Sequence, residues 1–304
     1  MAVAIRRMLA ALACSLIFAC TAFWCASSIR GEGLEFRVDT ELFKNEEKSP
    51  ILQQLTIFTA EGAVYDFCLT APTETTVFDP RHGRFTLLDE SRKKKALITT
   101  QELLDYSLAL EAHAAKQKDQ LFAFCAAAKF ETTEKEVDLN GQTHTELRLA
   151  AKSLTYTALG LKPPQPEAAK VYRHFADWCA RLNSSRAGNL PANARLLLNN
   201  AFAERDLLPF EITRTTAAAT PFGKKLDLRS EHRFNWALSG EDRKKIGNAG
   251  DMIATYELVS YDEYRAADAK PVPSTTPNSA AATKSTNPRK MSAASPFQWM
   301  SSQN

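Results

Sequence analysis

The side chains that could perform covalent or metal chemistry are few and widely spaced. The five histidines are His82, His113, His144, His174 and His232. No two of them stand at metal-ligand spacing, and the chain has no GxSxG, P-loop or HExxH motif. A cysteine nucleophile would need a histidine brought beside it from another element. We therefore predict that the protein is not an enzyme and that it holds no metal and no cofactor.

The cysteines that follow the first 30 residues are Cys68, Cys125 and Cys179. Their number is odd and no pair has CxxC spacing, so they do not form a disulfide framework. Either one bridge with one free thiol or three buried thiols would fit this pattern. His232 is either a satisfied histidine at a bend of a long strand, which we favour, or a polar group inside a pocket.

The N-terminus has the pattern of an export signal. Arg6 and Arg7 precede an uncharged run over residues 8–26, with small residues near its end. We predict a signal peptide or N-terminal membrane anchor over residues 1–30. Cleavage is favoured, and the alternatives are lipidation at Cys20 or an uncleaved span. Each places the rest of the chain in the periplasm or cell envelope.

Charge is unevenly distributed between the leader and the body. The chain's net charge of +3 equals that of Arg6, Arg7 and Arg30, which stand in a leader without acids, so residues 31–304 sum to zero. A neutral body offers no electrostatic surface for nucleic acid, and we expect no nucleic-acid partner.

Residues 266–304 are rich in Ala, Ser, Thr and Pro and contain a single acid, Asp268. Such a segment buries too little apolar surface to order itself, and we predict a disordered tail. Its apolar end, residues 296–300, is either incidental, which we favour, or a docking motif for a protein partner.

Alternation of apolar and polar residues predicts the main strands. In one segment the alternate residues Leu34, Phe36, Val38, Thr40 and Leu42 share one, mainly apolar, face. In a second segment Leu226, Leu228, Phe234, Trp236 and Leu238 share one face. The second segment is longer than most strands, so we expect a bend or bulge near Ser230 and His232. One apolar and one polar face indicate an antiparallel sheet that is packed on one side only.

Further strands and helices fill the chain between these segments. Additional strands are predicted over 52–59, 63–70, 75–78, 84–89, 94–98, 130–137, 143–157, 210–215 and 252–261. Asn140-Gly141 is a strong hairpin signal. Helices are predicted to start at Thr99 or Thr100, with a break near 116–119, and after Pro166 and Pro191. Ser239 with Asp242 indicates a short capped turn. The whole is an α+β domain over about residues 31–265, a large antiparallel sheet with helices on its apolar face.

The first third of this body resembles the periplasmic lipoprotein-carrier superfamily. The resemblance rests on the strand pattern of residues 63–67, 77–80 and 84–89, followed by a basic loop, Leu97-Ile98-Thr99-Thr100 and a helix. It implies a curved, incomplete antiparallel barrel whose concave face is covered by helices, with an acyl chain between them. It brings no catalytic residue. The chain is similar as well to exported bacterial proteins of unknown function.

These observations lead to a non-enzymatic envelope protein that binds a lipid or other apolar ligand in a half-barrel cavity. The candidate lining residues are Phe36, Phe175, Trp178, His232, Phe234 and Trp236. A basic run is a second candidate surface, for anionic lipid headgroups, and it consists of Arg92, Lys93, Lys94 and Lys95. The alternative function is an envelope scaffold without a small ligand, which docks partners through its tail.

Overall fold

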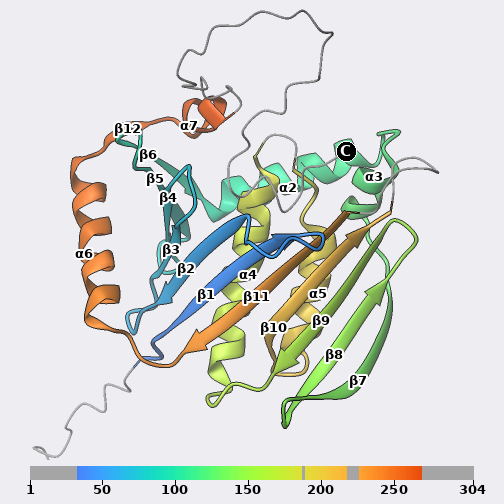
Figure 1. Ribbon diagram of the computed structural model, residues 1–304. Coiled ribbons are helices and arrows are strands. Elements are labelled where there is room, and N and C mark those ends of the chain that lie inside the picture. Colours follow the sequence, from blue (N-terminus) through green and yellow to red (C-terminus); the bar gives the residue numbers. More distant parts are fainter. Residues whose placement is uncertain (1–32, 187–188, 218–225, 269–304) are drawn as a thin grey trace, which may run out of the picture. The chain divides into compact units, whose positions relative to one another are not determined.

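The computed structural model describes residues 33–186, 189–217 and 226–268, and those from Leu34 onward belong to one compact unit (Figure 1). The predicted leader over residues 1–30 lies outside the described residues. The predicted tail also does, except for residues 266–268, which end a helix.

A single open sheet of twelve strands is the centre of the fold, in the order β12-β6-β5-β4-β3-β2-β1-β11-β10-β9-β8-β7. The strands are β1 Phe36–Lys44, β2 Leu52–Phe58, β3 Val64–Cys68, β4 Glu74–Asp79, β5 Arg84–Asp89, β6 Lys94–Thr99, β7 Glu131–Leu139, β8 Gln142–Ala150, β9 Leu154–Leu161, β10 Leu208–Thr216, β11 Leu226–Asn235 and β12 Glu257–Val259. All neighbours are antiparallel except β12, which pairs parallel to β6. The predicted α+β class with a large antiparallel sheet is confirmed.

Six helices accompany the sheet in the described residues. They are α2 Thr100–Ala114, α3 Gln120–Ala126, α4 Glu167–Ser184, α5 Asn193–Ala203, α6 Gly240–Thr255 and α7 Tyr261–Asp268. The sheet curves around α4 and α5, which lie on its concave face (Figure 1). This is the half-barrel arrangement with helices that the sequence indicated.

Local signals in the sequence account for most of these boundaries. Thr99 caps α2 through a capping box with Glu102, and Ser239 caps α6 in the same way with Asp242. Asn140 and Gly141 have φ of 55° and 79°, the left-handed geometry that a tight β7–β8 hairpin requires. The predicted break near residues 116–119 separates α2 from α3.

Two aromatic and aliphatic clusters fill the concave side. In the first, Phe36 of β1 stacks on Phe58 of β2 with ring centroids 4.2 Å apart, and Phe175 of α4 meets Phe58 edge-on at 5.5 Å. In the second, Leu198 and Phe202 of α5 pack on strands β8 to β10. Each helix therefore has its own half of the sheet.

The outer face of the sheet is not uniformly wet, contrary to the one-sided packing expected from the sequence. Helix α6 covers β2 to β5 there, with Ala249 packed against Ile57, Val77 and Leu88. Strands β4 and β5 are buried on both faces, so their sequences do not alternate as those of one-sided strands do.

Three strand predictions need correction. The predicted strand 143–157 is two strands, β8 and β9, because a turn without Gly or Pro interrupts it at 151–153. In the predicted strand 252–261, residues 252–255 are the end of α6, residue 261 begins α7, and only β12 is extended. No bulge occurs at Ser230 or His232, since β11 keeps continuous register with β1. Because β11 ends at Asn235, Leu238 turns to the outer cluster.

The two edges of the sheet differ in length and exposure. Strand β12 is only three residues long. Strand β7 is exposed along most of its length and carries four carboxylates and Lys135. Lys135 pairs with Glu146 of β8, and Arg205 reaches Glu134 from the end of α5.

Candidate functional site

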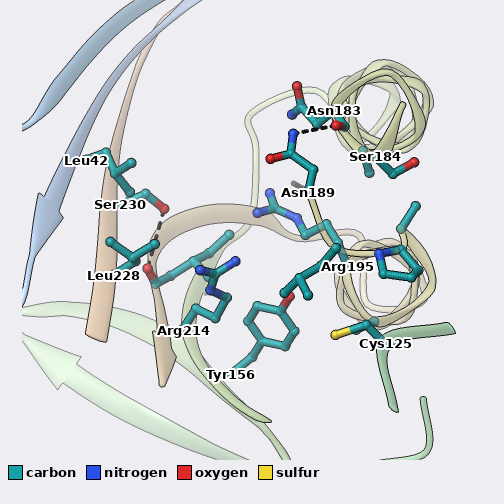
Figure 2. Close-up of a pocket in the computed structure, with 16 residues that line it drawn as sticks. Leu42, Cys125, Tyr156, Asn183, Ser184, Asn189, Arg195, Arg214, Leu228 and Ser230 are labelled. Carbon is teal, nitrogen blue, oxygen red and sulfur yellow. Dashed lines mark hydrogen bonds between the residues drawn. The ribbon is translucent and has the colours of Figure 1, made fainter. Parts of the chain in front are cut away.

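Two adjoining pockets, together named the inner cavity here, lie between the concave face of the sheet and helices α4 and α5. The space between the protein's atoms, including the part open to solvent, measures about 690 Å³ in the first pocket and about 740 Å³ in the second. Both pockets are lined by Leu42, Ala180, Asn183, Arg195 and Ser230. Figure 2 shows the first pocket, with strands on one side and helices on the other.

Apolar side chains make up much of the cavity wall. The sheet contributes Val38, Leu42 and Leu52, which share the inward parity of β1 and β2. Helix α4 contributes Phe175 and small alanines that leave room above the strands. Ligand sites commonly combine such apolar walls with a few placed polar groups.

A row of polar side chains crosses the floor of the cavity. His232 lies between Thr40 and Ser230, with Nδ1 3.1 Å from Thr40 Oγ1 and Nε2 3.0 Å from Ser230 Oγ. Burial lowers the pKa of His232 to about 3, so the ring is neutral at ordinary pH. His232 is thus at once a histidine with both ring nitrogens in hydrogen-bond contact and a residue that lines the pocket.

Asp66 of β3 is a buried carboxyl beside this row. It accepts a hydrogen bond from Thr56 Oγ1 at 2.7 Å and another from the amide of Gln54, and both partners line the cavity. Burial raises the pKa of Asp66 to about 6. The two hydrogen bonds favour the charged carboxylate, but they do not replace the water lost on burial, so the pKa stays above its ordinary value.

The folded pKa of Asp66 predicts a pH-dependent stability. An acid with pKa about 6 when folded and 3.8 when unfolded stabilises the fold at low pH and stops doing so as pH rises through 6. We expect the free energy of unfolding to fall between pH 4 and pH 7 by on the order of 3 kcal/mol from this group. Urea unfolding across this range measures it. Asp66→Asn should flatten the profile, and an unchanged slope in that variant would contradict the assignment.

Two arginines face the cavity and form no ion pair with a carboxylate of the described residues. Arg214 of β10 is 9% exposed, and its Nε has no hydrogen-bond partner among the described residues. Burial lowers the pKa of its guanidinium from the ordinary value. Arg195 of α5 donates from Nε to Asn199 Oδ1 at 2.9 Å, and Asn199 in turn donates to Asp177. Asp177 is paired with Arg173, so its charge is already matched.

The three cysteines within the described ranges, Cys68, Cys125 and Cys179, are free thiols. Cys125 and Cys179 line the cavity, while Cys68 donates a hydrogen bond to the carbonyl of Thr70. Burial raises the pKa of Cys68 and Cys125 to about 12 and that of Cys179 well above its ordinary value. A nucleophilic cysteine requires the opposite shift, so these thiols are suited to packing.

The structure distributes the predicted lining residues over two places. Phe175 and His232 line the inner cavity. Phe36, Phe234 and Trp236 form an aromatic cluster, with Phe36 and Trp236 centroids 5.4 Å apart. Trp178 packs at the edge of the same core, under the guanidinium of Arg181. These four are not among the residues that line the cavity.

Sequence reasoning missed Arg195, Arg214 and Tyr156. A signal for Arg214 existed, because it shares the inward parity of β10 with Ile212, which is buried. A charged residue on a strand is ordinarily expected on the solvent-facing side, so Arg214 was not expected to face the cavity.

The predicted membrane-surface residues contact the C-terminal segment of the described chain. Arg92 pairs with Asp89 and donates to the carbonyl of Tyr264, and Lys93 Nζ donates to Tyr256 Oη at 3.2 Å. Lys94 pairs with Glu263 at 2.7 Å, and Lys95 donates to the carbonyl of Ile253. The basic run over residues 92–95, which spans the β5–β6 turn and the start of β6, therefore contacts α6, α7 and the junction before β12.

A second buried polar cluster fixes α7 to the sheet. Arg186, which follows α4, reaches Glu74 of β4 with Nη2 2.5 Å from Oε1, and the two side chains are 2% and 9% exposed. Tyr264 of α7 donates to the other oxygen of Glu74 at 3.0 Å. Three segments far apart in the sequence thus meet at one carboxylate.

In the ranges that the structure describes, none of the helices has the length and apolar character needed to span a bilayer.

No protein-family model and no curated protein sequence matches the chain. Among solved structures, two crystal forms of PNGF-II align with 76% and 77% of this chain at 9% identity, with TM-scores of 0.33 and 0.34. The chain spans about a third of the length of PNGF-II, 32% and 33% in the two forms. A LolA superfamily protein from Nitrosomonas europaea aligns with 69% of this chain and 89% of its own at 3% identity, with a TM-score of 0.23. Similarity at this level leaves the function to be argued from the cavity itself.

Proposed function

We propose that the protein is a non-enzymatic binding protein of the cell envelope that holds a lipid or other apolar ligand in the inner cavity. The observation that carries the proposal is the cavity between a curved sheet and two helices, with apolar walls and few polar groups. The envelope location comes from the leader sequence alone. Protonated thiols and a histidine engaged on both ring nitrogens favour binding over covalent chemistry.

Native mass spectrometry of the full-length chain, followed by solvent extraction, tests the proposal. We expect a co-purifying species whose mass is that of an amphiphile and which unfolding releases. A fluorescent fatty-acid probe, 11-(dansylamino)undecanoic acid, should bind the delipidated chain and be displaced by unlabelled amphiphiles. A clean apo mass together with no probe binding would contradict the proposal and leave the scaffold function as the better one.

A further inference from the structure

Arg195 and Arg214 enter the inner cavity from opposite walls. Arg214 projects from the inward face of β10, whereas Arg195 comes from α5 (Figure 2). Arg195 lines a third pocket as well, between α4, α5 and β10, so it lies where the three pockets meet. The two guanidinium groups are therefore presented to the same interior space.

Neither guanidinium has a carboxylate partner in the described part of the chain. The hydrogen bond from Arg195 ends on a neutral amide, and the carboxylate beyond that amide belongs to Arg173. Arg214 has neither an ion pair nor a hydrogen bond within the described ranges, although it is nine-tenths buried. Burying a cation without a counter-charge lowers the free energy of unfolding by roughly several kcal/mol.

Tyr156 adds a neutral donor to this region. It lies opposite Arg214 in the register of β9 and β10, is 5% exposed, and points its hydroxyl into the pocket that the arginines line (Figure 2). Burial raises its pKa above the ordinary value, so the phenol keeps its proton. Two cations and a hydroxyl donor next to an apolar wall match a negatively charged group attached to an apolar chain.

We propose that Arg195 and Arg214, assisted by Tyr156, bind the anionic headgroup of an amphiphile, a carboxylate or a phosphate ester, whose chain lies along the wall toward Phe175. This inference rests on the proposed function and specifies the ligand class of the same cavity. It assigns the unpaired arginines to recognition of the ligand instead of to stability of the fold.

Paired probes with one chain and two headgroups test the inference. The full-length delipidated chain is titrated with 11-(dansylamino)undecanoic acid and with its methyl ester, which lacks the charge. We expect the acid to bind more tightly by about 10- to 100-fold, as charge-assisted hydrogen bonds imply. In Arg214→Met and Arg195→Met, the acid should lose this preference while the ester binds as it does to the wild type.

Arg148→Met is the matched control. Arg148 also stands on a strand, but it is exposed and alternates with the buried Leu147 and Leu149, so it faces away from the cavity. The Arg148→Met variant should prefer the acid over the ester by the same factor as the wild type. Arg214→Lys, which keeps a charge without the planar fork, should retain part of the preference and shows that a loss in Arg214→Met is not due to misfolding.

The outcomes separate the headgroup site from the cavity. Equal binding of acid and ester by the wild type overturns the headgroup site and leaves the proposed function standing. If neither probe binds, the proposed function fails with it. Titration with inorganic phosphate tests whether the arginines bind a free anion instead. Tight phosphate binding that is lost in Arg214→Met and that the acid probe does not compete with would mean a free-anion site. That result would overturn the inference.

Discussion

Replacing Arg186 by methionine is expected to lower the free energy of unfolding by about 3–5 kcal/mol. The Glu74 side chain is 9% exposed, and without the guanidinium its carboxylate keeps only neutral donors, the hydroxyls of Tyr264 at 3.0 Å and Thr76 at 3.5 Å. A buried charge that loses its counter-ion carries the full cost of desolvation. The loss should also loosen α7, because Tyr264 holds the same carboxylate.

Guanidinium-chloride unfolding followed by far-ultraviolet circular dichroism measures this effect. Arg233→Met is the matched control, since Arg233 pairs with Glu41 but its side chain is 62% exposed, and exposed pairs contribute about 0–1 kcal/mol. The double variant Glu74→Gln with Arg186→Met should recover part of the loss, because no charge is then left unpaired. A single-variant loss below about 1 kcal/mol would refute the buried pair as a stabilising contact.

Ala180→Phe is expected to weaken binding of the fatty-acid probe by about 100-fold. Ala180 lines both pockets of the inner cavity, so a phenyl ring there occupies space that the ligand would use. Exclusion of about four methylene groups, each worth about 0.8 kcal/mol, costs roughly 3 kcal/mol of binding free energy. The ring would fill existing space, and for that reason the fold should tolerate it.

The control for this experiment is Val171→Phe on the same helix. Val171 is 37% exposed, and adding the same ring there leaves the cavity unchanged. Probe titration should give wild-type affinity for Val171→Phe and greatly reduced affinity for Ala180→Phe, with equal thermal melts confirming that both fold. Unchanged binding by Ala180→Phe would place the ligand elsewhere on the chain.

Most of the fold was predictable because the signals that specify it are local. The capping box at Thr99, the turn at Asn140-Gly141 and the alternation of β1 each depend on a few neighbouring residues. The covering of β2 to β5 by α6 was not predictable in this way, since strands buried on both faces lose the alternation that identifies a face.

The candidate site was predictable only in part. Phe175 and His232 were among the candidate lining residues, and both line the cavity. Arg195 and Arg214 were missed because a single charge in a sequence is ordinarily solvated, and the tertiary structure shows that both line the cavity. Likewise, Glu74 and Arg186 are 112 positions apart, and no local rule pairs them.

The exposed edge strand β7 limits how the sheet can grow. Its free backbone could template a further strand from a second molecule, as open sheet edges do in aggregation. Antiparallel pairing of two such edges would bring the acids of one copy, among them Glu131, Glu136 and Asp138, against those of the other. Electrostatic repulsion therefore opposes polymerisation at this edge, and added salt, which screens it, is the condition under which copies would begin to join.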